Sequence, residues 1–264
     1  MLTFLALTAA VFYLAATAVF ARPLTHRQPL PRALGMSLAA AAVFAHAWAL
    51  FGAHRGGVDL HFFAALSLVG ACTAALCVLV NLARPVATLG VIVFPLATVL
   101  LLVDVFAAPA TQPLPIEWQI KLHVVFALLG FSVLCVAALL AILLALQERA
   151  LRAHRFNGIA GALPPLTLTE ALMFQMIAAG FALLTLALLS GILFVDNLFA
   201  QHLIHKTVLS IAAWIVFGAL LFGRWRYGWR GRRAVRLMLI GMALLLLAYL
   251  GSRFVLELVL KRVP

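Results

Sequence analysis

The stretch WQIKLHVVFALLGFSVLCVAALLAILLALQ (118–147) decides the fold of this chain. It holds 30 residues with a single charge, on Lys121, and no proline. A helix needs about 20 apolar residues to cross the hydrocarbon core of a bilayer, at a rise of about 1.5 Å per residue. This stretch is therefore long enough to span a membrane as a helix and then to tilt or to extend beyond the bilayer.

Similar apolar stretches fill most of the remaining sequence. They run at 2–20, 33–53, 59–81, 86–107, 170–195, 203–223 and 234–260. In the whole chain 66% of residues are hydrophobic and 10% are charged, against about 25% charged in an average soluble domain. We therefore expect an all-α integral membrane protein, a bundle of about eight transmembrane helices that forms a single integral domain over 1–264. This composition excludes a soluble enzyme, a nucleic-acid-binding module and a disordered chain.

The distribution of positive charge predicts how the helices are oriented. The formal net charge is +12, and thirteen of the 19 Lys and Arg residues fall on one side when alternate loops are assigned to opposite sides. The positive-inside rule places that side in the cytoplasm. We therefore expect both termini outside, in the periplasm of a bacterial inner membrane. The lipid bilayer, with its anionic headgroups, is the expected partner of the basic loops.

The positions of the three cysteines and the absence of known catalytic motifs exclude several functions. Cys72, Cys77 and Cys135 lie within apolar stretches, and none belongs to a Cys-x-x-Cys or Cys-x-x-Cys-His motif. We therefore expect neither a covalently attached haem nor a dithiol oxidoreductase. No Ser-His-Asp order, HExxH motif, P-loop or Gly-rich dinucleotide signature is present, so we expect no enzyme.

Two histidines inside apolar stretches are the main candidates for a functional site. His46 lies about seven residues before the outer end of its helix, and His123 lies about six residues after the outer start of its own, so both are about 10 Å deep. A haem ligated from two sides needs one imidazole above and one below the iron, at the same depth. His46 and His123 are thus candidate axial ligands of the iron of a non-covalent haem b. The alternative is that each forms a structural hydrogen bond to a neighbouring helix.

Other histidines are expected near the outer face. His54 and His61 flank one outer loop, whereas His202 and His205 lie in another at the i, i+3 spacing that shares a helix face. His202 and His205 are candidate supporting residues at an outward haem edge. Solvated side chains at the interface are the alternative, and a zinc site is disfavoured because no Cys or paired carboxylate accompanies them.

The sequence HKTVLSIAAWIVFGALLFGRWRYGWRGRRAV (205–235), followed by AYLGSRFVLEL (248–258), resembles the YpjD branch of the CcsA/CcmC cytochrome c assembly superfamily. FAHAWAL (44–50) and KLHVVFALLGFSVL (121–134) match the same branch, so the resemblance covers nearly the whole chain. It implies an integral helical bundle that handles haem at the outer face of the membrane. His123 matches an outer histidine of the haem-exporting relatives, and His46 matches a histidine of the YpjD branch.

The resemblance also assigns roles near the C-terminal end of the chain. Trp214 and Arg224 match the frame that follows a tryptophan-rich loop in the haem-exporting relatives, and we take both as candidate cofactor-binding residues. The corresponding loop here, DNLFAQHLIHK (196–206), contains no tryptophan.

Three functions follow as hypotheses. The first is a haem-binding inner-membrane protein that holds or traffics haem b near the outer leaflet, with haem-handling or other membrane proteins as partners. The second is a cofactor-free membrane scaffold or partner subunit. The third, a small-solute or ion transporter, would need several buried acids or broken helices, whereas the sequence offers mainly Asp104.

Overall fold

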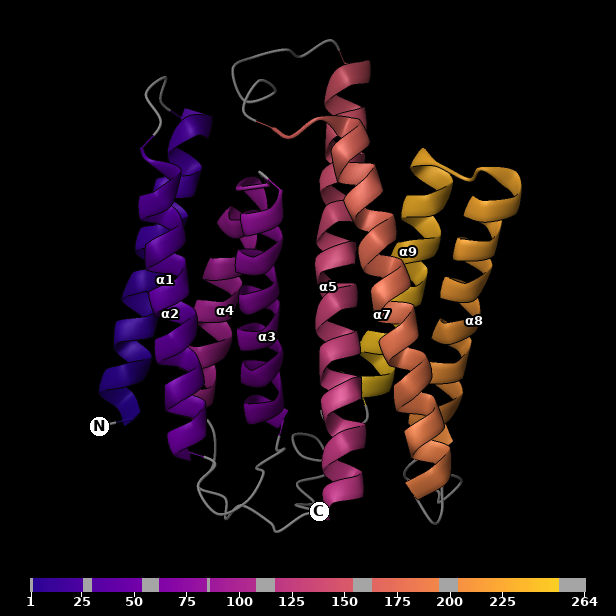
Figure 1. Ribbon diagram of the computed structural model, residues 1–264, viewed down its shortest axis with the longest axis horizontal. Helices are drawn as coiled ribbons and strands as arrows, with labels where there is room; N and C mark the ends of the chain where they lie inside the picture. Colours follow the sequence, from indigo (N-terminus) through magenta and orange to yellow (C-terminus); the bar gives the residue numbers. More distant parts are fainter. Residues whose placement is uncertain are drawn as a thin grey trace. The chain divides into compact units, whose positions relative to one another are not determined.

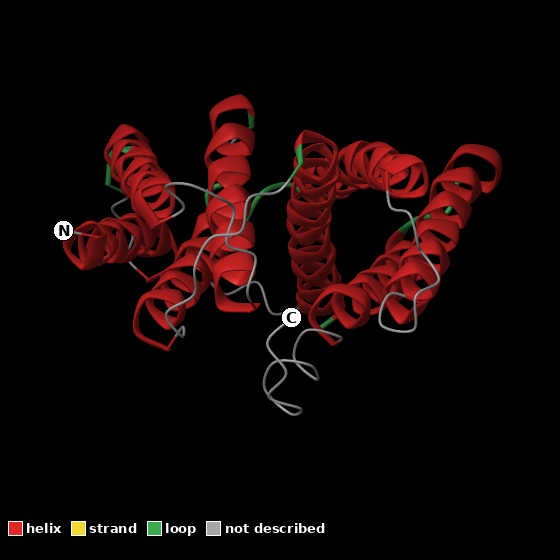
Figure 2. Ribbon diagram, turned by 90° about the horizontal axis from the view of Figure 1, so that it is seen from below, coloured by secondary structure: helices red, strands yellow, loops and turns green. Residues whose placement is uncertain are grey.

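The structure is a computed structural model that describes residues 2–25, 30–53, 62–84, 86–107, 117–153, 163–194 and 204–251. Within these ranges every regular element is a helix (Figure 1, Figure 2). Seven helices are long and apolar enough to cross a membrane. They are α1 (Leu2–Thr25), α2 (Arg32–Ala53), α3 (Phe62–Ala83), α4 (Thr88–Ala107), α5 (Trp118–Arg152), α7 (Leu166–Phe194) and α8 (Ile204–Tyr227). The expected all-α membrane bundle is confirmed.

The last helix of the described chain is shorter. Helix α9 (Gly231–Leu246) has 16 residues and continues into a π-helical segment, η1 (Leu247–Gly251). The apolar stretch at 234–260 extends further, but residues after 251 lie outside the described part. The total of about eight spans and the outward position of both termini therefore stay predictions.

Helix α5 continues past its apolar stretch, which is one of the two expected outcomes, whereas the start of α7 differs from the expected boundary. Helix α5 runs to Arg152, beyond the apolar stretch, because QERALR (147–152) contains good helix formers. Helix α7 starts at Leu166, directly after Pro164 and Pro165, since a proline within the helix would remove a backbone hydrogen bond. The Gln147 side chain donates a hydrogen bond from Nε2 to the Pro164 carbonyl at 3.0 Å. This bond ties the end of α5 to the start of α7.

The described residues belong to two compact units. The first comprises Met1–Pro115 and Leu146–Leu168, and the second comprises Ile116–Ala145 and Thr169–Pro264. Helix α5 gives residues to both units, and the single integral domain expected from the sequence stays a prediction.

Small side chains let the helices of the first unit approach closely. Helix α1 packs against α2 and α4, and α3 packs against the same two helices (Figure 1). Ala6 and Ala9 of α1, Ala45 of α2 and Leu101 of α4 form a buried cluster. Because lipid and side chains are equally apolar, close van der Waals packing replaces the hydrophobic effect as the force between such helices.

Glycines have the same role in the second unit. A Cβ atom at Gly180 of α7 would lie 2.6 Å from Cγ of Leu134 on α5, and one at Gly241 of α9 would lie 2.6 Å from the Phe217 ring on α8. Both contacts are closer than real Cβ atoms allow. The absence of a side chain at these two positions therefore lets the helices approach closely.

Candidate functional site

His46 lies at the meeting point of three helices in the first unit. Its Nδ1 atom is 3.3 Å from the hydroxyl of Tyr13 on α1, and its Nε2 atom is 3.1 Å from Oγ of Ser67 on α3. The side chains of all three residues have no exposed surface. His46 is thus held from two sides by hydroxyl groups in an otherwise apolar interior.

An aromatic stack fixes the position of the Tyr13 hydroxyl. The Tyr13 ring lies parallel to that of Phe94 on α4, with centroids 5.7 Å apart and an interplanar angle of 21°. The His46 ring meets the Tyr13 ring edge-on at 83°. A neutral imidazole has one donor and one acceptor nitrogen, so one hydroxyl donates to the ring and the other accepts from it. In this arrangement both His46 nitrogens already have partners.

His123 has a different hydrogen-bond pattern. It lies on α5 in the second unit, half-buried, with Nδ1 3.1 Å from Oγ of Ser190 on α7. Ser190 donates its one hydroxyl proton to the Ala187 carbonyl at 2.9 Å. With this proton used there, the Ser190 oxygen accepts from His123, and the hydrogen-bond network assigns the ring proton to Nδ1. In a neutral imidazole the lone pair is then on Nε2, which is the form that binds a metal.

The helix bounds place both histidines near helix ends, and their depth in the membrane stays a prediction. His46 and His123 each lie within about two turns of a helix end, Ala53 for α2 and Trp118 for α5. Trp118 contacts Phe194 of α7, with ring centroids 6.1 Å apart, and so marks the end of the second unit near His123. Because the two histidines belong to different units, their pairing on one iron stays a prediction.

Of the four histidines expected near the outer face, the structure describes only His205. His205 is exposed on the first turn of α8. His54, His61 and His202 lie outside the described residues. The supporting role of His202 and His205 therefore stays a prediction.

Trp214 is held between α8 and α7. Its indole Nε1 donates to Oγ1 of Thr185 at 2.9 Å, and its ring stacks on Phe181 with centroids 5.4 Å apart. These contacts join α7 to α8. The cofactor-binding role carried over from the resemblance is a separate expectation and stays a prediction.

Arg224 takes part in an ion-pair network at the C-terminal end of α8. Its Nη1 atom is 3.2 Å from Oε1 of Glu170, and Nε of Arg230 is 3.4 Å from the same oxygen. The Arg224 guanidinium also lies 4.6 Å above the Phe174 ring. Only 10% of the Glu170 side chain is exposed. Because the carboxylate sits near the start of α7, the network joins that helix to the end of α8. The cofactor-binding role of Arg224 stays a prediction.

Four residues of these sites carry no special signal in the sequence. They are the hydroxyl partners of the two histidines and the buried acid: Tyr13, Ser67, Ser190 and Glu170. Glu170 is the most recognisable, as an acid at the edge of an apolar stretch on the strongly basic side of the chain. The hydroxyl groups become meaningful only when the neighbouring helices are placed.

Fold and site together define a class: a polytopic helical membrane protein with hydroxyl-bonded histidines inside its spans. The profile of the cytochrome c assembly protein family matches residues 30–260. The chain belongs to this family, and the family resemblance seen in its sequence is confirmed.

Individual relatives agree with this assignment. The chain is 41% identical over 139 residues to the inner membrane protein YpjD of Escherichia coli K12, an alignment that covers 52% of each chain. It is 37% identical over 171 residues to an uncharacterized 28.8 kDa protein of Azospirillum brasilense, covering 61% of this chain and 63% of the relative. Identity to the cytochrome c biogenesis protein CcsA of Guillardia theta is 27% over 165 residues, covering 56% and 54%.

The chain thus spans about half the length of these curated relatives. No solved structure matches it.

Proposed function

We propose that this protein handles haem b in the bacterial inner membrane and that His123 is a ligand of the iron. The observation that carries the proposal is the hydrogen-bond pattern around His123. Ser190 gives its proton to the Ala187 carbonyl, so it accepts the His123 Nδ1 proton and leaves the Nε2 lone pair for a metal. Membership of the cytochrome c assembly family makes haem the fitting iron compound. The location follows the name of the YpjD relative.

The residues around His123 suit a haem edge. The histidine is half-buried, close to Trp118 and Phe194 at the end of the second unit. Such an apolar and aromatic setting would suit a porphyrin face. Bound haem would be either a cargo for transfer to another protein or a one-electron redox centre. The protein contributes a fixed imidazole in the correct tautomer.

His46 is the candidate for a second ligand. To bind iron through Nε2, its ring would leave Ser67 and keep a hydrogen bond from Nδ1 to the Tyr13 hydroxyl. Both histidines would then have the same arrangement, with Nδ1 bonded to a hydroxyl and Nε2 free. Such a partner on the other ring nitrogen is a general property of histidine ligands.

A cofactor-free scaffold is the second candidate function. It is favoured by the full burial of His46 and by the partners of both its nitrogens, because a structural histidine has these properties. In this case the Tyr13–His46–Ser67 bonds would serve only to join α1, α2 and α3.

Absorption spectroscopy separates the two functions. The full chain is produced in haem-replete cells and purified in mild detergent together with His46→Ala and His123→Ala. The haem proposal predicts a Soret band with split visible bands of low-spin haem in the wild type, lost or shifted to high spin in His123→Ala. Ser132→Ala, which removes another buried polar group from α5, is the control and keeps the wild-type spectrum. A colourless wild-type protein would establish the scaffold instead.

A further inference from the structure

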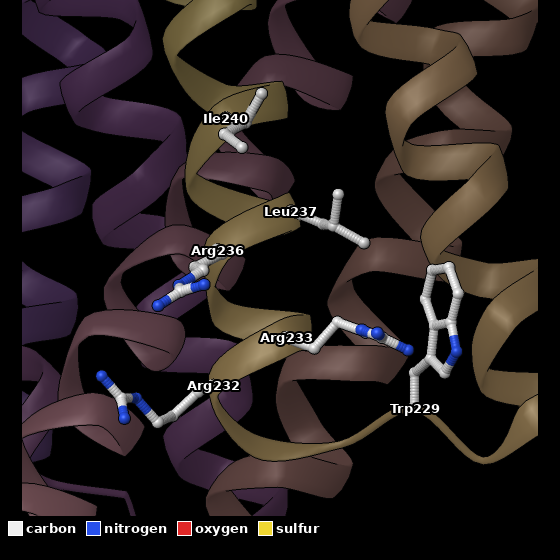
Figure 3. A pocket seen from close by; sticks show the side chains of 6 residues that line it. All are labelled: Trp229, Arg232, Arg233, Arg236, Leu237 and Ile240. Atoms are coloured by element: carbon white, nitrogen blue, oxygen red, sulfur yellow. The ribbon is translucent and has the colours of Figure 1, made fainter.

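A basic pocket lies beside the start of α9 in the second unit (Figure 3). Its volume of about 620 Å³ lies within the range of small-molecule sites. Three arginines and three aromatic or aliphatic side chains line it. They are Trp229, Arg232, Arg233, Arg236, Leu237 and Ile240.

The pocket has a charged end and an apolar end. The arginines belong to the first two turns of α9, and Leu237 and Ile240 follow further along the helix (Figure 3). Arg233, Leu237 and Ile240 are spaced by four and three residues, so they share one face of the helix. At 1.5 Å per residue the lining extends about 12 Å from Arg232 to Ile240.

The turn between α8 and α9 builds the aromatic wall. Gly228 has φ +64°, which reverses the chain at the end of α8. The Trp229 amide then donates to the Gly223 carbonyl at 3.2 Å, and the indole occupies the space where a Gly223 side chain would be. The Arg233 guanidinium lies 4.9 Å above the Trp229 ring. Trp229 and Arg233 are therefore fixed relative to each other.

Among the described residues, no acid neutralises the positive charge of the pocket. The lining residues that the structure describes include no carboxylate, and the first turn of α9 contains no acidic residue. Glu170 pairs with Arg224 and Arg230 instead. The described part of the chain gives Arg232 and Arg236 no acidic partner. The first amides of α9 also have no side-chain cap at Arg230, and they add to the local attraction for an anion.

We propose that this pocket binds the headgroup of an anionic phospholipid. The phosphate would contact the guanidinium groups of Arg232 and Arg236, which extend to one side of α9 (Figure 3). Arg233, which lies over the Trp229 ring on the other side, would add positive charge. The upper part of an acyl chain would lie along Leu237 and Ile240, where half of the Ile240 side chain is exposed. A free phosphate ion would leave this apolar end unused. Basic pockets beside membrane helices are a known way to recognise such lipids.

Native mass spectrometry of the full chain in detergent tests the proposal. The probes are phosphatidylglycerol, cardiolipin and phosphatidylcholine with the same acyl chains, inorganic phosphate, and haemin. We expect phosphatidylglycerol or cardiolipin to bind and phosphatidylcholine to bind at least tenfold more weakly. Arg236→Gln should weaken the anionic lipid about fivefold, and the triple change to Gln at Arg232, Arg233 and Arg236 about 100-fold, at about fivefold per arginine.

A triple control removes the same charge elsewhere. Arg149→Gln, Arg152→Gln and Arg226→Gln change exposed arginines that do not line the pocket, and this variant should bind within twofold of wild type. Equal loss in both triple variants would mean nonspecific charge attraction and would overturn the proposal. So would competition by inorganic phosphate at the affinity of the lipid, or displacement of the lipid by haemin. Arg236→Gln, a single exposed change, gives the answer if the triple variant does not fold.

Discussion

The Oγ atom of Ser190 lies 3.1 Å from Nδ1 of His123 and 2.9 Å from the Ala187 carbonyl oxygen. A carbonyl only accepts, so the serine proton is used there and the histidine must be the donor in the other contact. A bond between two neighbouring helices thereby sets the tautomer of a half-buried imidazole. The proposed haem ligand depends on this relationship.

Ser190 should therefore control haem affinity without touching haem. Ser190→Ala removes the acceptor of the Nδ1 proton, and loss of such a partner weakens metal binding about 10- to 100-fold. Ser190→Thr keeps the hydroxyl and should restore most of the affinity. Haemin titration followed at the Soret band measures both. Equal affinity in wild type and Ser190→Ala would contradict the assigned tautomer.

If His46 binds iron, removal of its two hydroxyl partners should change haem affinity in different ways. Tyr13→Phe removes the partner of Nδ1 and should weaken haem binding by tenfold or more. Ser67→Ala frees Nε2 and should leave the affinity unchanged or raise it. Haemin titration of both variants makes the comparison.

A purely structural His46 gives another result. In that case both variants would leave haem binding unchanged, and each would lower the free energy of unfolding by about 1–3 kcal/mol, because each leaves a buried polar atom without a partner. Thermal unfolding in detergent measures this loss.

Glu170 should be important for stability. Glu170→Gln removes the charge that pairs with Arg224 and Arg230, and we expect a loss of about 1–3 kcal/mol in the free energy of unfolding. Glu148→Gln is the control, since its partner Arg152 is 65% exposed and such pairs contribute about 0–1 kcal/mol. Thermal unfolding in detergent should show a clearly larger drop for Glu170→Gln. Equal midpoints would show that the network is dispensable.

The packing of α5 against α7 gives a further prediction. Gly180→Ala places a methyl group against Leu134 and should cost about 1–3 kcal/mol in stability. Gly218→Ala is the control, because its Cβ would meet only Phe181 at 3.5 Å, an ordinary contact. The control should be neutral or slightly stabilising, since alanine favours helices over glycine. Thermal unfolding that ranks the two variants in the opposite order would refute the close approach at Gly180.

The spans could be predicted from the sequence because hydropathy along a membrane helix is a local property. The apolar stretch at 118–147 forms most of α5. Hydropathy predicts the start of this helix's successor, α7, at residue 170, four residues after the observed start at Leu166, because Thr167 and Thr169 are polar. Helix formation there depends on the proline boundary rather than on hydropathy.

The partners of the histidines could not be predicted. A hydroxyl in an apolar helix usually bonds to the carbonyl four residues earlier, as Thr17, Thr98 and Thr185 do at 2.8–2.9 Å. Ser67 looks the same in the sequence, yet its hydroxyl lies beside His46 on another helix. Only the packing of the helices separates the two kinds of hydroxyl. The ion pair of Arg224 with Glu170, 54 residues away, could not be predicted for the same reason.

The most direct test of haem ligation is rescue of His123→Gly by free imidazole. The purified variant, loaded with haemin, is followed by absorption and electron paramagnetic resonance spectroscopy before and after imidazole is added. The account predicts a low-spin wild type, a high-spin or haem-depleted variant, and return of the low-spin signal with imidazole. A variant that keeps the wild-type low-spin spectrum without imidazole would contradict ligation by His123.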